Sequence, residues 1–225
     1  MKLQRSGKKI WLSHSGVDVL YRCPKCFWLR YKYKIYQPQG IVSRLPVRFD
    51  KIIKDYFNGY RIKGELPPII KDQLKGQLQN PFQETYFYPI NQKYGFFGKL
   101  DDCLITPEGN HAVIDFKTAS SDPRKRDDIF PAYQRQLDEY TFLLKAKRKP
   151  VAENGYLIYF YPGDIQNLDQ GVPMIIHIEK IKTNPQSVLP RLAEAIEVLE
   201  GKMPQSSDDC PYCQWHDDIK TLPVD

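Results

Sequence analysis

Two C-x-x-C pairs lie far apart in this 225-residue chain, Cys23-Pro-Lys-Cys26 near one end and Cys210-Pro-Tyr-Cys213 near the other. Two residues between cysteines allow both thiolates of a pair to bind one metal ion. If the two pairs share a site, the amino-terminal segment must lie beside the carboxyl-terminal tail, which constrains nearly the whole fold. The residue types alone do not choose between tetrahedral zinc and a [4Fe–4S] cluster, because four thiolates serve both.

A hairpin is predicted near the middle of the chain. Residues 94–106 and 111–118 alternate between apolar and polar side chains as strands do, and Pro107-Glu-Gly-Asn110 between them has the composition of a tight turn. Residues two apart on a strand share a face, so Asp115 and Lys117 are expected to project to the same side.

The length of the hairpin loop decides where Asp101 lies. A three-residue loop places Asp101 directly across from Asp115 or from Lys117, whereas a two-residue loop puts it on the opposite face. Directly opposed side chains have Cβ atoms about 5 Å apart, close enough for two carboxylates to hold one hard divalent cation. A metal site therefore requires the odd loop or a bulge. The alternative interpretation is an ordinary solvated strand face.

The remaining pattern predicts an α/β protein. The clearest helix covers residues 132–147, where Gln136 and Tyr140 lie one turn apart and can address the same place beyond the sheet edge. Further amphipathic helices are predicted at residues 47–60 and 185–200, and further strands at residues 84–90, 156–161 and 174–182. This order suits a mixed central β-sheet with helices on its faces.

Charge and composition indicate an anionic partner. The net charge is +6, and the basic residues between Arg22 and Lys34 are interleaved with aromatic ones, a mixture able to neutralise phosphates and stack bases. No apolar run reaches the length of a membrane span, and the basic start lacks the hydrophobic stretch of a secretory signal. We therefore expect a cytoplasmic protein without a membrane partner, in which the paired cysteines bind metal rather than form disulfides.

Three short motifs follow one another in the central region: Gly98-Lys-Leu-Asp101, Asp115-Phe-Lys117 and Gln136-Leu-Asp-Glu-Tyr140. This order of G-x-x-D, D-x-K and Q-x-x-x-Y resembles the PD-(D/E)xK nuclease superfamily, specifically the branch that holds the RecB nuclease domain and the CRISPR-associated Cas-four exonucleases. Residues 13–15, Ser-His-Ser, followed by residues 21–27, Tyr-Arg-Cys-Pro-Lys-Cys-Phe, resemble the amino-terminal signature of the same branch.

The resemblance implies a single nuclease-like domain over residues 1–225 with a restriction-endonuclease-like core. Residues 1–80 would form an amino-terminal helical part with the first C-x-x-C pair, residues 81–200 the core, and residues 201–225 the tail that closes the cysteine site. The resemblance also favours the [4Fe–4S] cluster. Relatives usually place one cysteine early and three late, whereas this chain has two and two, so zinc stays open as the alternative.

The favoured mechanism is metal-dependent hydrolysis of phosphodiester bonds. Asp101 and Asp115, with the backbone carbonyl of Phe116, would hold Mg²⁺ or Mn²⁺. Lys117 would orient the attacking water and stabilise the transition state.

Three further residues are assigned by the resemblance. In the family, the residues that correspond to Gln136 and Tyr140 lie beside the DNA and the metal-bound water. The helix at residues 47–60 usually contributes a histidine to the metal site, and this chain has Asp50 near the expected place instead. Asp50 is either a third carboxylate ligand or a charge on the solvent side of an amphipathic helix.

The expected function is therefore that of a DNA nuclease. The resemblance adds a preference for single strands or ends, with a role in recombination, repair or CRISPR spacer acquisition. The chain has no G-x-x-x-x-G-K-[ST] phosphate loop, so a helicase or the subunits of an adaptation complex would be separate partners. The alternatives are a non-catalytic nucleic-acid-binding module and a scaffold subunit, each stabilised by the metal at the four cysteines.

Overall fold

The computed structural model describes residues 9–38, 44–126, 128–164, 167–169 and 171–222, and the chain divides into two compact units. The first unit comprises Met1–Val42, Phe87–Phe97 and Ser187–Asp225, and the second comprises Ser43–Tyr86 and Gly98–Gln186. The predicted amino-terminal part and tail include residues 1–8, 39–43 and 223–225, which lie outside the described residues.

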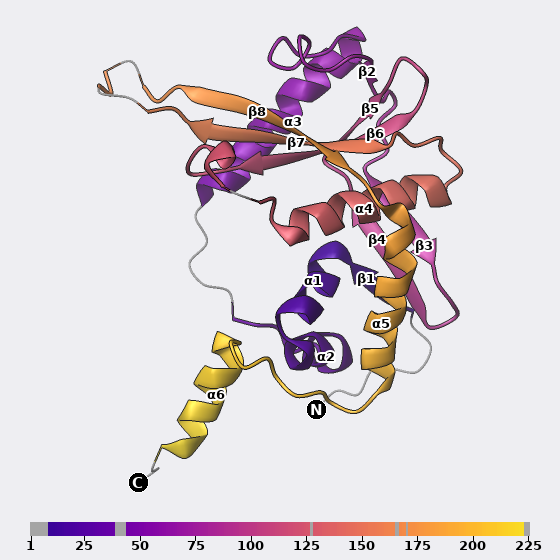
Figure 1. Ribbon diagram of the computed structural model, residues 1–225, viewed down its shortest axis with the longest axis vertical. Helices are drawn as coiled ribbons and strands as arrows, with labels where there is room; N and C mark the ends of the chain where they lie inside the picture. Colours follow the sequence, from indigo (N-terminus) through magenta and orange to yellow (C-terminus); the bar gives the residue numbers. More distant parts are fainter. Residues whose placement is uncertain (1–8, 39–43, 127, 165–166, 170, 223–225) are drawn as a thin grey trace. The chain divides into compact units, whose positions relative to one another are not determined.

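A five-stranded mixed sheet forms the centre of the second unit (Figure 1). Its strands follow the order β2 (Gln77–Leu78), β5 (Asp102–Ile105), β6 (His111–Thr118), β7 (Asn154–Pro162) and β8 (Met174–Lys182). β6 and β7 are parallel, whereas the pairs β2 with β5, β5 with β6 and β7 with β8 are antiparallel. The predicted α/β fold with a mixed central sheet is therefore confirmed.

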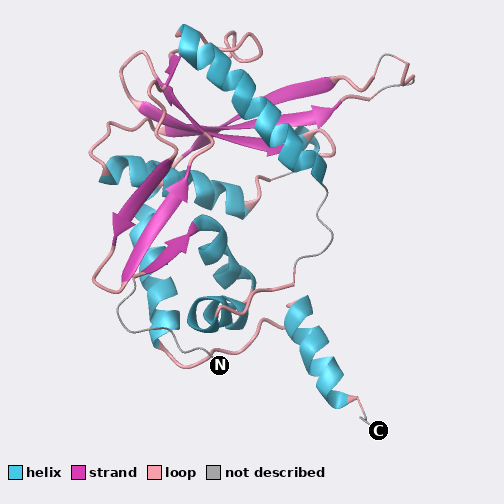
Figure 2. Ribbon diagram, turned by 180° about the vertical axis from the view of Figure 1, so that it is seen from behind, coloured by secondary structure: helices cyan, strands magenta, loops and turns pink. Residues whose placement is uncertain are grey.

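Two helices pack on this sheet, α3 (Arg44–Lys63) and α4 (Pro131–Ala146). α3, the long helix that crosses the strands in Figure 2, buries Phe57, whose ring centroid lies 4.6 Å from that of Phe116 on β6. Successive residues of a strand point to opposite faces. Asp115 and Lys117 therefore lie on the face of β6 that is turned away from this aromatic core.

The β5–β6 hairpin has the three-residue loop that the predicted metal site requires. Thr106 donates its N–H to the Asn110 carbonyl oxygen at 2.8 Å, so these two residues close the loop. Gly109 within it has φ +83°, a left-handed conformation that glycine adopts without a steric penalty. The first of the two predicted registers, Thr106 opposite Asn110, is confirmed.

The single strand predicted over residues 94–106 is divided in two. β4 (Tyr94–Lys99) belongs to a three-stranded sheet of order β1 (Ile10–Ser13), β4, β3 (Thr85–Pro89), whereas β5 begins only at Asp102. Between them Leu100 is fully buried and donates its N–H to the Glu84 carbonyl oxygen at 2.8 Å. The prediction of one continuous strand was wrong because alternation does not reveal where a chain passes from one sheet to another.

The first unit is mainly helical. Its elements are β1 (Ile10–Ser13), α1 (His14–Arg22), α2 (Pro24–Tyr33), α5 (Val188–Glu200) and α6 (Pro211–Thr221), together with parts of β4 and of β3 (Thr85–Pro89). Ser13 caps α1 by accepting a hydrogen bond from the Gly16 N–H at 3.3 Å. Cys23 ends α1, and Pro24 opens α2 at the first-turn position that proline favours.

Two short 3-10 helices, Pro123–Lys125 and Pro185–Ser187, are also present among the described residues. Within the described ranges, no helix is both long enough and apolar enough to cross a membrane.

Candidate functional site

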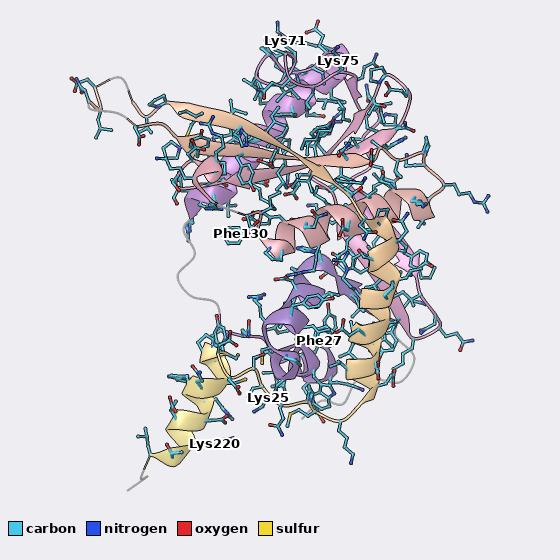
Figure 3. The ribbon with its side chains drawn as sticks, in the orientation of Figure 1. Lys25, Phe27, Lys71, Lys75, Phe130 and Lys220 are labelled. Atoms are coloured by element: carbon cyan, nitrogen blue, oxygen red, sulfur yellow. The ribbon has the colours of Figure 1, made fainter. Side chains whose placement is uncertain are left out.

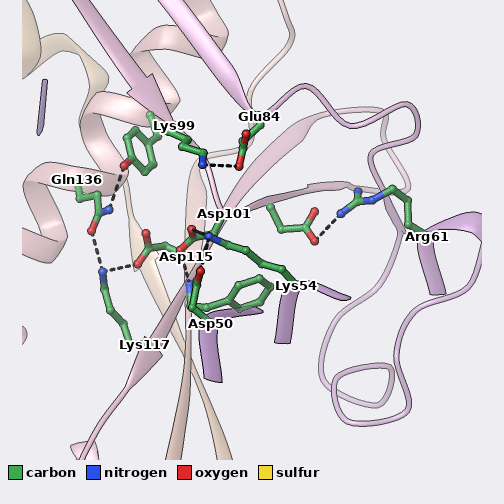
Figure 4. A network of polar contacts seen from close by, with 12 residues as sticks. Asp50, Lys54, Arg61, Glu84, Lys99, Asp101, Asp115, Lys117 and Gln136 are labelled. Atoms are coloured by element: carbon green, nitrogen blue, oxygen red, sulfur yellow. Dashed lines mark hydrogen bonds and ion pairs between the residues drawn. The ribbon is translucent and has the colours of Figure 1, made fainter. Parts of the chain in front are cut away.

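The turn before β5 brings Asp101 beside β6. Asp102 pairs with Ile114, and continuing this register by one residue sets Asp101 opposite Asp115. Asp101 Oδ2 accepts a hydrogen bond from the Phe116 N–H at 3.1 Å. The carboxylate of Asp101 is thus held against the strand that carries Asp115, as the odd loop predicted (Figure 4).

Asp115 is a buried acid with one cationic neighbour. Its side chain is 1% exposed, and Oδ2 lies 2.5 Å from Lys117 Nζ. Burial is the largest cause of a pKa raised to about 7; the charge of Lys117 lowers this pKa, and the charge of Asp101 raises it. Oδ2 has the ion pair but no donor aligned for a hydrogen bond among the residues described. Such a carboxyl group has capacity for a further cation.

Helix α4 holds the amino group of Lys117. Lys117 Nζ donates to Gln136 Oε1 at 2.8 Å, and Gln136 Nε2 donates to the Tyr140 hydroxyl oxygen at 3.1 Å. Lys117 Nζ also lies 4.3 Å from the centroid of the Tyr133 ring, within cation–π range. Burial, the largest cause, raises the pKa of Tyr140, which therefore keeps its proton at neutral pH. Gln136 and Tyr140 are therefore linked to Asp115 by a chain of polar contacts that runs through Lys117.

Lys54 is a member of this network that the sequence analysis missed. From α3, its Nζ lies 2.9 Å from Asp101 Oδ1 and 2.9 Å from Asp50 Oδ1. Burial opposes its charge, but the two carboxylates outweigh burial and raise the pKa of Lys54. The available signal was the spacing of Asp50 and Lys54, which are one helical turn apart. Asp50 is thus separated from Asp101 by one ammonium group.

The two acids fit a divalent cation. Asp101 and Asp115 supply hard oxygen donors from neighbouring positions, and their mutual repulsion is the kind of strain that a cation relieves. Phe116 contributes its N–H to Asp101 and its ring to the core. A metal-binding role for the Phe116 carbonyl oxygen, and likewise for Asp50, stays a prediction.

A buried ion pair anchors the turn that carries Asp101. Arg61 Nη2 lies 2.7 Å from Asp102 Oδ2, and Nη1 donates to the Gln79 carbonyl oxygen at 2.6 Å. The side chains of Arg61 and Asp102 are 6% and 1% exposed. Asp102 Oδ1 accepts a hydrogen bond from the Cys103 N–H at 2.7 Å. Both carboxylate oxygens of Asp102, the residue after Asp101, are therefore held by partners.

The four paired cysteines converge in the first unit. All four sulfurs lie within 4.8 Å of one another, and each residue is buried. Cys23 and Cys26 flank the start of α2, and Cys210 and Cys213 flank the start of α6. Phe27, labelled in Figure 3, is fully buried directly after the first pair. The predicted approach of the two ends of the chain is therefore observed.

His216 and Cys103, two further residues of types that can bind metal, lie outside this cluster. His216 is exposed and its Nδ1 lies 3.0 Å from Asp217 Oδ1, so it does not replace a thiolate. Cys103 is fully buried on β5, and burial, the largest cause, raises its pKa to about 12. A thiol in that state is a packed core residue and not a nucleophile.

Three solved structures are similar to this chain, and the first of them, with a TM-score above 0.5, supports the fold. The crystal structure of SSO0001 matches with a TM-score of 0.51 and 18% identity over 93% of this chain and 85% of that chain. A phage-related exonuclease from Haemophilus somnus 129PT matches with a TM-score of 0.43 and 12% identity over 92% and 83% of the two chains. LHK-Exo in complex with dAMP gives 0.40 and 12% over 84% and 86%.

The sequence matches one protein-family model. No curated protein matches the sequence. The family model described as "PD-(D/E)XK nuclease superfamily" matches residues 69–217, which include Asp101, the Asp115-Phe-Lys117 motif and the second cysteine pair. The match covers well over half of the chain and agrees with the order of motifs and with the mixed sheet. The protein belongs to the PD-(D/E)XK nuclease superfamily.

Proposed function

We propose that this protein is a metal-dependent nuclease that hydrolyses phosphodiester bonds of DNA. The observation that carries the proposal is the convergence of Asp101, Asp115 and Lys117, which the three-residue hairpin loop sets on one face. All three lie within residues 81–200, the segment proposed as the nuclease core.

Asp101, Asp115 and the backbone carbonyl of Phe116 would hold Mg²⁺ or Mn²⁺, with Asp50 as a further candidate ligand. When bound, the cation lowers the pKa of a coordinated water and neutralises charge on the scissile phosphate. Asp115 must give up its proton to bind, since its pKa of about 7 leaves it partly protonated near neutral pH.

Lys117 would act on the phosphate itself. Its ammonium group is held in place between Asp115 and Gln136, and it would stabilise the negative charge that develops on the phosphoryl oxygens. Gln136 is fixed in turn by the Tyr140 hydroxyl, so both residues of α4 act as positioning residues. Because Tyr140 stays protonated, it can donate a hydrogen bond but cannot serve as a general base.

A cavity on the neighbouring strand suits a nucleotide beside the scissile phosphate. Tyr159 on β7 pairs with Lys117 and lines a cavity of about 270 Å³. Arg126 and Phe130 line it too, with the Arg126 guanidinium 4.7 Å from the Phe130 ring centroid. An arginine for phosphate and aromatic rings for bases are the groups that single-stranded nucleic acids require.

The finer assignment rests on the resemblance of the motifs. We infer a RecB-like nuclease of the Cas-four type that acts on single strands or duplex ends, in recombination, repair or CRISPR adaptation. Helicase or adaptation-complex subunits are the proposed partners.

The test is a cleavage assay on the 225-residue chain. With Mn²⁺ or Mg²⁺ it is expected to shorten end-labelled single-stranded DNA, and excess EDTA is expected to stop the reaction. Blunt duplex and RNA of the same sequence establish substrate preference. DNA binding without any cutting in either metal would overturn the proposal and favour the non-catalytic binding module or the scaffold subunit.

The affinity for Mn²⁺ is expected to depend on pH through Asp115. The raised pKa means that the folded, metal-free protein keeps a proton on this carboxyl below pH about 7, and a cation must displace it. We expect the dissociation constant to rise by up to about tenfold per unit as pH falls below 7, and to level off above it. Titration calorimetry at pH 6, 7 and 8 measures this. Equal affinity at all three values would contradict it, and Asp115→Asn should flatten the profile.

Replacing Lys54 is expected to strengthen Mn²⁺ binding. Its ammonium group neutralises Asp101 in the metal-free protein and repels an incoming cation. Lys54→Met removes this competition, so we expect binding to tighten several-fold, on the order of 1 kcal/mol. Lys51→Met is the matched control, because Lys51 lies on the same helix and pairs at 3.0 Å with Asp55. Weaker binding in Lys54→Met would show that the ammonium group supports the site.

A further inference from the structure

The four sulfurs of the cysteine site lie close together. Cys23 Sγ lies 3.8 Å from Cys213 Sγ, while Cys26 Sγ lies 3.7 Å from Cys210 Sγ and 3.7 Å from Cys213 Sγ. None of the sulfurs is more than 4.8 Å from another. The four donors thus surround a small central space.

A single tetrahedral ion fits this space. Zn–S bonds of about 2.3 Å with tetrahedral angles place neighbouring sulfurs about 3.8 Å apart. These three Sγ–Sγ separations, 3.7 to 3.8 Å, agree with this edge length. The two pairs also have the same local structure, since each spans the first turn of a helix that begins with proline, Pro24 in α2 and Pro211 in α6.

A [4Fe–4S] cluster does not fit. Each of its four thiolates binds a different iron, so two sulfurs are separated by an iron–iron edge in addition to two Fe–S bonds, about 6 Å or more. Every sulfur pair in this site is closer than that, at 4.8 Å or less. This chain also differs from the relatives in having two cysteines near each end of the sequence, Cys23 with Cys26 and Cys210 with Cys213, instead of one early and three late.

We propose that Cys23, Cys26, Cys210 and Cys213 bind one zinc ion and not the iron–sulfur cluster that the family resemblance implies. A mononuclear iron has the same coordination geometry, but Zn²⁺ binds a given thiolate set more tightly than Fe²⁺. The site then has no redox function, because zinc does not change its oxidation state. Its role is to hold the carboxyl-terminal helix to the amino-terminal pair of helices.

The packing of α6 shows why this helix needs the ion. Cys213 is its only buried residue among those described, and Tyr212, Trp215 and Ile219 are exposed. A cavity of about 490 Å³, lined by residues of α2 and of α6, leaves the two helices incompletely packed. With so little apolar area buried, the metal–thiolate bonds are the main attachment of α6 within the first unit.

The first experiment is metal analysis of the 225-residue chain, purified under anaerobic conditions without added metal. We expect about one zinc per chain, no acid-labile sulfide and no visible colour. About four irons with matching sulfide and a brown solution would overturn the proposal. One iron without sulfide would overturn the choice of zinc, and a protein that neither contains zinc nor binds added Zn²⁺ would overturn the site.

Variants locate the ion. Asp101→Asn with Asp115→Asn removes the acidic site and is expected to leave the zinc content unchanged, whereas Cys210→Ser is expected to reduce it at least tenfold. Cys103→Ser is the matched control, a buried cysteine outside the cluster that should retain zinc. Loss of zinc from the acidic double variant alone would overturn the assignment.

Limited proteolysis of the wild-type protein gives a measurement that needs no variant. Chelation of zinc is expected to accelerate cleavage between residues 202 and 210 at least tenfold, because α6 is then no longer attached. Added Zn²⁺ should restore protection, and Mg²⁺ should not. An unchanged cleavage rate after verified removal of zinc would show that α6 is held by other contacts and would overturn the structural role.

Discussion

Replacing Asp115 with Asn is expected to slow the cutting of labelled single-stranded DNA about 10³-fold, equivalent to about 4 kcal/mol of lost transition-state stabilisation. Asn has nearly the same volume, so the position, which is 1% exposed in the native protein, stays filled. What is lost is the negative charge that would hold the cation and pair with Lys117. Single-turnover rates at saturating Mn²⁺ measure the effect, and fluorescence anisotropy should show that DNA binding persists.

Lys117→Ala tests the other half of the same site and is expected to cause a loss of similar size. Lys99→Ala is its matched control, because Lys99 is an exposed lysine in the same region whose Nζ lies 3.0 Å from Glu84. We expect the control to retain its single-turnover rate within about twofold. Cutting at the wild-type rate by either the Asp115 or the Lys117 variant would refute the assignment of the active site.

The hairpin could be predicted from sequence because its determinants are local. The turn residues mark where the chain reverses, and the strand period fixes which side chains share a face once the loop length is known. The requirement that Asp101 oppose Asp115 selected an odd loop, and the hydrogen bond between Thr106 and Asn110 bears this out. The two C-x-x-C pairs could likewise be recognised as metal ligands from their spacing.

Other features depend on contacts between distant residues and could not be predicted in this way. The break at Leu100 and Asp101 follows from the pairing of β4 with β1 and of β5 with β6 in different sheets. Lys54 reaches Asp101 from a helix that lies far away in sequence. Such partners are set by the tertiary arrangement, which periodicity does not encode.

The size of the cysteine site is another feature that the sequence could not predict. C-x-x-C spacing identifies the donors but says nothing of the distance between the two pairs, so the residue types alone do not choose between zinc and a four-iron cluster, and only the family resemblance favours the cluster. Coordinates add the missing distance of 3.7 Å between Cys26 Sγ and Cys210 Sγ. The choice of metal therefore depends on the distance between the first turns of α2 and α6, which is set by packing within the first unit.

Asp102→Ala is expected to destabilise the second unit by about 3–5 kcal/mol. The substitution leaves the Arg61 guanidinium, in a side chain only 6% exposed, without its carboxylate partner. A charge buried without a partner is costly because the interior does not replace its lost hydration. The Gln79 carbonyl oxygen would remain as an acceptor but carries no full charge to compensate. Because Asp102 also anchors the turn beside Asp101, Mn²⁺ affinity is expected to fall as well.

A double-mutant cycle separates this effect from simple loss of contacts. Arg61→Met combined with Asp102→Ala removes both charges, and the pair is expected to cost less than Asp102→Ala alone. Glu84→Gln breaks the exposed pair with Lys99 and should cost about 0–1 kcal/mol. Urea unfolding is followed by circular dichroism and by hydrogen exchange in β5 and β6. Tryptophan fluorescence would not report on the second unit, because all three tryptophans belong to the first. If the double variant is the least stable of the series, the pair stabilises the turn by its attraction, and relief of a buried charge is not the explanation.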